Sequence, residues 1–153
     1  MNHSVAIESV VSRRFSLAAV TRCLPAVTRV GLGLLFFVSG LNGFLNFLPA
    51  PSAPMPEGAI ALGAAFMKSG YLFPLIAGTE AVAGALLLTN RLVPLALVLL
   101  APVIVNIFAF HWFLASSGLG MAVVLLVVEL YLAWVYRSVY LPMLAVRVTP
   151  HAA

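Results

Sequence analysis

Residues 71–89 read YLFPLIAGTEAVAGALLLT, an apolar run in which Glu80 is the one acidic or basic side chain. A run of this kind is typical of a membrane-spanning helix, which needs about 20 residues to cross the hydrocarbon core. A charged group at that depth costs about 3 kcal/mol or more unless it has a partner, a proton or a water-lined cavity. The run therefore predicts a membrane helix in which Glu80 is the residue most worth testing.

The composition of the whole chain also indicates a membrane protein. Of its 153 residues, 63% are hydrophobic and 8% are charged, whereas soluble domains average about 25% charged residues. Uninterrupted apolar runs cross a bilayer as helices, because a helix satisfies its own backbone hydrogen bonds, while a transmembrane barrel alternates apolar and polar residues. We therefore expect an all-α fold in contact with a lipid bilayer.

The charges and the single cysteine argue against several other classes of protein. The net charge is +4, but the basic residues stand at the ends of apolar runs instead of forming a stripe with aromatics, so we expect no nucleic-acid partner. One cysteine, Cys23, excludes an internal disulfide and a CxxC pair. Phosphate-binding loops and metal-ligand spacings such as HExxH are not found, and we expect no metal site.

Four apolar runs predict a four-transmembrane-helix bundle, with spans at about residues 26–48, 71–89, 92–113 and 119–136. The proline-rich connector 49–56 cannot continue a helix. The segment 57–69 after it is too short to span, so we expect a short interfacial helix there, with Pro56 at its first position and Gly70 just past its end. The expected organisation is an N-terminal tail (1–25), a membrane domain (26–137) and a C-terminal tail (138–153).

The basic residues orient this bundle. Seven arginines fall on one side of the predicted spans, and Lys68 alone falls on the other. The positive-inside rule then places both termini in the cytoplasm, and the expected location is a bacterial inner membrane.

Polar side chains gather in the outward half of the predicted bundle. Along span one, Ser39, Asn42, Gly43 and Asn46 recur at helical spacing. The depth of each residue in the membrane follows from its position along the span, at about 1.5 Å per residue. Five polar residues then fall in the outward half, where one pocket could gather them: Asn42, Asn46, Glu80, Asn106 and His111. Glu80 is the candidate proton acceptor or donor. The alternative for the asparagines is hydrogen bonding between helices, at about 0.6 kcal/mol each.

Three further features of the spans have more than one interpretation. His111 is a proton relay, a quinone hydrogen-bond partner or an interfacial anchor beside Trp112. Glu129, near the midplane of span four, either faces the bundle or reaches the arginines through water. Small residues beside Glu80, among them Gly84, predict close approach of a neighbouring helix.

Glycine, glutamate and proline landmarks resemble those of the DoxX family of small four-helix membrane proteins. They are Arg29-Val-Gly-Leu-Gly33, Phe37-Val-Ser-Gly40-Leu41, Gly78-Thr-Glu80 through Gly84, and Pro94 at the start of span three. The resemblance covers about residues 29–137. It implies a component of a thiosulfate:quinone oxidoreductase or terminal quinol oxidase system, with partner redox subunits and Glu80 as the acid of span two. Many members carry a basic residue after the span-one glycine, where this chain has Asn42 and Gly43.

Three functions remain open at this point. The first is a membrane redox accessory whose outward pocket binds a quinone headgroup, with Glu80 exchanging a proton. The second is a non-enzymatic scaffold or assembly subunit whose polar residues lock the helices together. The third is a small-solute or proton transporter, which four spans without an inverted repeat would form as a homo-oligomer.

Overall fold

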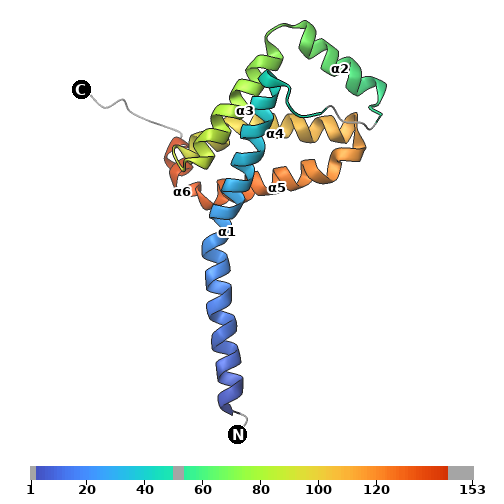
Figure 1. The fold of residues 1–153 in the computed structure, drawn as a ribbon. Helices are drawn as coiled ribbons and strands as arrows, with labels where there is room; N and C mark the ends of the chain where they lie inside the picture. The colour runs from blue at the N-terminus through green and yellow to red at the C-terminus, as the bar shows by residue number, and fades with distance from the viewer. Residues whose placement is uncertain (1–2, 50–53, 145–153) are drawn as a thin grey trace, which may run out of the picture.

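The structure is a computed structural model that describes residues 3–49 and 54–144, with side chains over 23–49 and 54–142. Within these ranges the regular structure is helical throughout, which confirms the all-α prediction (Figure 1). The elements in order are α1 (His3–Leu45), α2 (Glu57–Lys68), α3 (Leu72–Leu88), α4 (Val93–Phe113), the 3-10 turn η1 (Ser116–Gly118), α5 (Leu119–Val135), α6 (Arg137–Tyr140) and the 3-10 turn η2 (Leu141–Leu144).

Three stretches are long and apolar enough to cross a membrane. They are Cys23–Leu45 of α1, Val93–Phe113, and Ser116–Val135. Helix α3 has 17 residues, about 26 Å at 1.5 Å per residue, slightly less than a hydrocarbon core of about 30 Å. Helices α2 and α3 meet the same criterion only together, and they are bent by 91°. The described chain thus has three spanning candidates, or four if the bent pair is one span.

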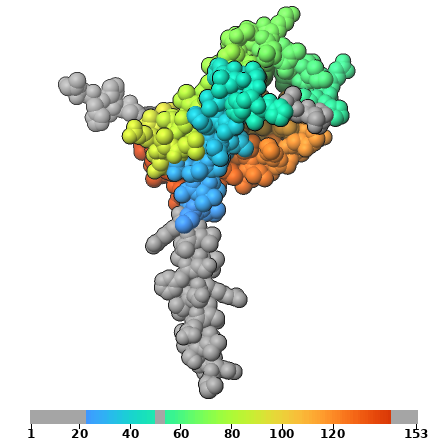
Figure 2. All heavy atoms as spheres, viewed as in Figure 1, coloured from blue at the N-terminus to red at the C-terminus, as the bar shows by residue number. Residues whose placement is uncertain are grey.

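The distribution of apolar side chains indicates contact with lipid. The interior is small, with Phe36, Leu97 and Leu132 almost fully buried. The outer faces carry many exposed apolar side chains, such as Val124, which is 59% exposed, and Phe113, which is 79% exposed. Soluble monomers rarely expose contiguous apolar surface on this scale. The space-filling view shows the same helices packed into one body (Figure 2).

Helices α1 and α3 approach each other unusually closely. A Cβ atom on Gly40 would overlap the backbone of Ala81 and the carbonyl oxygen of Ala77, and one on Gly84 would overlap the backbone of Phe37. Only glycine fits at such crossings, as between membrane helices with small interfacial residues. The close approach predicted from Gly84 and its small neighbours is therefore confirmed.

The bounds of α1 and α2 differ from those predicted. Helix α1 begins at His3 and continues through Pro25, so the predicted tail and the first predicted span lie on one helix. Residues 3–24 contain no glycine or proline to break a helix, and the Thr28 hydroxyl donates to the carbonyl oxygen of Leu24 at 2.8 Å, beside the proline. Helix α1 ends at Leu45, and Pro56 is the N-cap of α2 instead of its first residue.

The C-terminal part of the chain folds back onto the start of α4. Helix α6 and η2 occupy the beginning of the predicted tail, and residues 145–153 lie outside the described chain. The Tyr140 hydroxyl donates a 2.9 Å hydrogen bond to the carbonyl oxygen of Pro94. At the same end of the bundle the Arg29 guanidinium donates to the carbonyl oxygen of Leu87, which also accepts from the backbone N–H of Asn90 at the end of α3.

Candidate functional site

Glu80 lies in the middle of α3 and is buried, with 8% of its surface exposed. The Ser39 hydroxyl of α1 donates a 2.9 Å hydrogen bond to its Oε2 atom. This bond crosses the close contact between α1 and α3. It partners one carboxyl oxygen, while the side chain also lines open space on two sides.

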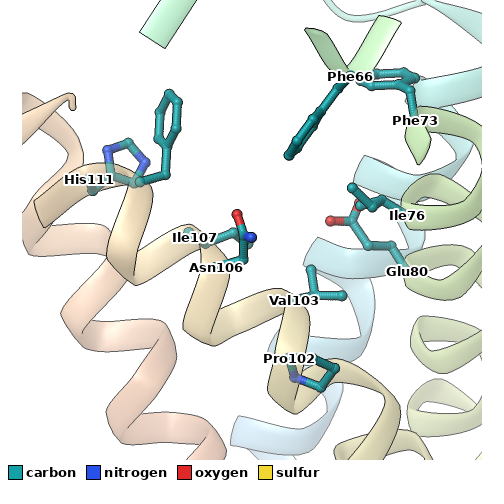
Figure 3. Close-up of a pocket in the computed structure, with 10 residues that line it drawn as sticks. Phe66, Phe73, Ile76, Glu80, Pro102, Val103, Asn106, Ile107 and His111 are labelled. Carbon is teal, nitrogen blue, oxygen red and sulfur yellow. The ribbon is translucent and has the colours of Figure 1, made fainter. Parts of the chain in front are cut away.

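The larger space beside Glu80 is a cavity of about 370 Å³, which we call the α4-side cavity. Helices α2, α3 and α4 contribute its walls: Phe66, Phe73, Ile76, Glu80, Pro102, Val103, Asn106, Ile107, Phe110 and His111. Figure 3 shows Glu80 and Asn106 on facing helices, with their polar ends directed into the space between them. The cavity thus joins three of the predicted site residues within mainly apolar and aromatic walls.

A second cavity of about 200 Å³ lies on the other side of Glu80, and we call it the α1-side cavity. Its lining residues are Ser39, Asn42, Gly43, Phe73, Ile76, Ala77 and Glu80. Phe73, Ile76 and Glu80 line both cavities, so they form the wall between the two. The single pocket predicted from depth is therefore two cavities, because Asn42 and Asn106 approach Glu80 from different helices and from different sides.

Two asparagines of span one serve the end of α1. The Asn42 Oδ1 accepts a 2.7 Å hydrogen bond from the backbone N–H of Leu48, while the residue also lines the α1-side cavity. Asn46 has a left-handed backbone with φ of 49°, a conformation that asparagine tolerates where helices end. Asn46 is exposed and lines neither cavity, so its visible role is to terminate α1.

His111 is held at the end of α4 while it lines the α4-side cavity. Its Nδ1 lies 2.9 Å from the carbonyl oxygen of Ala115, so Nδ1 carries a proton that it donates and Nε2 is left as an acceptor in the neutral ring. A Cβ atom on Gly118 would overlap the ring. His111 is thus held at the end of α4 and lines the α4-side cavity, while its roles as proton relay, quinone partner or interfacial anchor stay predictions.

Glu129 lies apart from the two cavities. It is buried in α5 with 5% of its surface exposed and lines neither of them. Among the described residues no group donates to its Oε2. Burial raises the pKa of the nearby Tyr140 phenol, and the Glu129 carboxylate raises it further. Glu129 therefore lies on the side of the bundle near Tyr140 of α6, away from the two cavities.

Some cavity residues were not among the predicted site residues. Ser39 stands at helical spacing with Asn42, and this was the available signal for its role as partner of Glu80. Phe66 and Phe110 lie on separate helices, and no sequence pattern relates them.

Glu80 and His111 are the titratable groups that line the two cavities, and Ser39, Asn42 and Asn106 offer hydrogen bonding there. In residues 3–49 and 54–144, no group of three or more His, Cys, Asp or Glu side chains is placed to hold a metal ion. No family model, no curated protein and no solved structure matches the chain. The resemblance to the DoxX family stays a prediction.

Proposed function

We propose that this chain is an integral membrane protein with four spans whose α4-side cavity binds the headgroup of a quinone, as an accessory of a membrane redox system of the DoxX kind. The observation that carries this proposal is the cavity itself, which is lined by Glu80, Asn106 and His111 together with aromatic side chains. Its volume of about 370 Å³ lies at the lower end of the range of about 300–1,000 Å³ common for small-molecule sites.

The chemistry of these walls suits a flat ring with two carbonyl oxygens. Phe66, Phe73 and Phe110 supply aromatic faces and edges for packing. The Asn106 amide supplies hydrogen-bond donors for a carbonyl oxygen of the ring. Glu80 supplies a carboxyl group that exchanges a proton with a ring hydroxyl in the reduced form.

In this proposal α3 is the second span and α2 lies at the interface. Arg29, Arg91 and Arg137 stand at one end of the bundle, and Lys68 stands at the end of α2. The positive-inside rule then orients both termini toward the cytoplasm. The cavities consequently lie in the outward half of the membrane.

A scaffold is the second candidate, and the contact between α1 and α3 favours it. The Ser39–Glu80 hydrogen bond and the glycine crossing at Gly84 join the two helices without any need for a ligand. Under this alternative, Glu80→Gln keeps an oxygen that accepts from Ser39 and is tolerated, whereas Gly84→Leu removes the close approach and destabilises the protein.

The test is binding of decylubiquinone to the purified chain in lipid nanodiscs. In a Trp134→Phe background, Trp112, next to the cavity residue His111, is the single tryptophan whose fluorescence the quinone quenches. We expect saturable quenching, weaker binding for Glu80→Gln, and loss of binding for Asn106→Leu. The matched control is Thr79→Val, which changes the neighbour of Glu80 on α3 without touching either cavity.

Three results would decide between the candidates. Quenching that does not saturate in the parent protein contradicts the quinone proposal. Equal binding by the parent, Glu80→Gln and Asn106→Leu contradicts it as well, because the quinone then sits elsewhere. Normal melting of Glu80→Gln, together with strong destabilisation by Gly84→Leu and no quinone binding, supports the scaffold.

A further inference from the structure

We propose that the α1-side cavity holds water and is the route by which the Glu80 carboxyl exchanges protons with the aqueous phase at the end of α1. The inference deepens the proposed function, since a ligand that exchanges a proton with Glu80 needs a path for that proton. The presence of water does not depend on what the α4-side cavity binds, so the two proposals can fail separately.

The size and polarity of the α1-side cavity suit water. Its volume is about 200 Å³, whereas one water molecule takes up about 30 Å³ in the liquid and needs two to four polar partners. The Ser39 hydroxyl, the Asn42 amide and the Glu80 carboxyl line the space and provide such partners. An apolar cavity of this size would stay dry, but this one has polar groups contributed by both α1 and α3.

The position of Glu80 makes it the link between the two cavities. Its carboxyl group stands in their common wall, and the 2.9 Å hydrogen bond from Ser39 holds Oε2 on the α1 side. A hydroxyl group both donates and accepts hydrogen bonds, so Ser39 also orders a water molecule beside the carboxyl. Ser39 is therefore a positioning residue, and it reaches the ligand only through Glu80.

The proton-transfer step needs only water as its second reactant. The O–H bond of the protonated carboxyl breaks, a water molecule in the α1-side cavity takes the proton, and the carboxylate remains. The reverse step restores the carboxylic acid. Among the residues that line the two cavities, Glu80 and His111 are the titratable ones, and His111 is confined to the α4 side.

The route from this cavity to bulk water is short. Asn42 and Gly43 lie within one turn of Leu45, where α1 ends, and the next residues, Asn46 and Phe47, are exposed. Toward α4, in contrast, Phe66 and Phe110 line the larger cavity, while Phe73 lines both cavities. The α1 side therefore offers water the more polar approach to Glu80, past Ser39 and Asn42.

The first experiment asks whether water reaches the cavity. In a Cys23→Ser background, the Ser39→Cys variant in nanodiscs is treated with a charged, water-soluble methanethiosulfonate. The control is Val82→Cys, on a face of α3 that is exposed outside both cavities. We expect at least about tenfold faster modification at position 39, because reaction needs a hydrated thiolate and apolar surroundings suppress it. Equal rates at the two positions would overturn the proposal.

The second experiment follows the Glu80 proton itself. In a Glu129→Gln background, Glu80 is the one acid left within the spans, and its carboxylic C=O band is followed by infrared spectroscopy during H/D exchange in buffer acidic enough to show it. We expect Ser39→Ala to slow exchange at least about tenfold. The effect should be smaller than the ~10²-fold or more that a positioned acid or base often contributes, because a water molecule partly replaces the lost hydroxyl. Ser39→Thr restores the rate.

Asn106→Leu separates the two proposals. It is expected to abolish quinone binding and to leave the exchange rate of the Glu80 band unchanged, since it alters only the α4-side cavity. Exchange that is as fast in Ser39→Ala as in the parent, or that Asn106→Leu slows as much as Ser39→Ala does, contradicts the route through the α1 side. Rapid, Ser39-dependent exchange without quinone binding supports the route and contradicts the quinone proposal.

Discussion

Gly84 of α3 lies so close to Phe37 of α1 that a Cβ atom on the glycine would overlap the Phe37 backbone. Gly84 is one helical turn from Glu80, and Phe37 is two residues from Ser39. The crossing of the two helices therefore brings the Ser39 hydroxyl within 2.9 Å of the Glu80 carboxyl. A contact made by backbone alone thus sets the position of the acid between the two cavities.

Substitution of Gly84 by alanine is expected to destabilise the bundle. The new Cβ meets backbone atoms of α1, which cannot rotate away, and overpacking of this kind typically costs about 1–3 kcal/mol. The matched control is Gly31→Ala in α1, where an added Cβ meets nothing within 4 Å. That change is expected to be neutral or to stabilise by up to about 1 kcal/mol, because alanine favours a helix. Thermal melting in detergent measures both, and a stable Gly84→Ala would contradict the close crossing.

Run length and chain breakers determine where α4 begins and ends, so the sequence predicted its bounds well. The run from Leu92 to Phe113 became α4 with a difference of one residue, since Asn90 and Arg91 before it and the serines after it end helices.

The division of the site into two cavities was not predictable in this way. It depends on the rotation of α1 and α4 about their axes, which tertiary packing sets, so depth along a span placed Asn42 and Asn106 together.

Replacement of Glu129 by methionine is expected to stabilise the protein. The carboxyl is buried, and its Oε2 has no hydrogen-bond partner among the described residues, a condition that costs about 1–3 kcal/mol. Methionine has a similar length and no such group to satisfy, so the melting temperature should rise. Glu129→Gln retains buried polar atoms and should show no comparable gain. A fall in melting temperature for Glu129→Met would show that the carboxyl has a partner such as bound water.

Tyr140→Phe is expected to weaken the closure of α6 on α4 at neutral pH. The change removes the 2.9 Å hydrogen bond to the Pro94 carbonyl oxygen, which is worth about 0.5–1.5 kcal/mol. The control is Tyr71→Phe, because Tyr71 is 63% exposed and its loss should have little effect. Melting curves of the two variants that coincide would contradict a role for the Tyr140 bond.

The same tyrosine predicts a dependence on alkaline pH. Burial, the Glu129 carboxylate and Tyr136 raise the pKa of Tyr140 in the folded protein, whereas the unfolded chain loses this proton near its ordinary value of about 10. The unfolded state then binds fewer protons, so the contribution of Tyr140 to stability is complete below about pH 10 and declines above it. Melting temperatures measured across this range should fall more steeply for the parent than for Tyr140→Phe, and parallel curves would contradict the shift.

The contact between His111 and Gly118 is open to a double-mutant cycle. An added Cβ at Gly118 would overlap the imidazole ring, so Gly118→Ala should push the ring from its 2.9 Å contact with the Ala115 carbonyl oxygen. We expect a loss of about 1–3 kcal/mol in the parent and almost none in a His111→Ala background, where the ring is gone. The Gly118 backbone has φ of −95°, which alanine adopts without strain. Equal losses in both backgrounds would show that the cost lies in the turn and not in the displaced histidine, and the ring would then not be held as described.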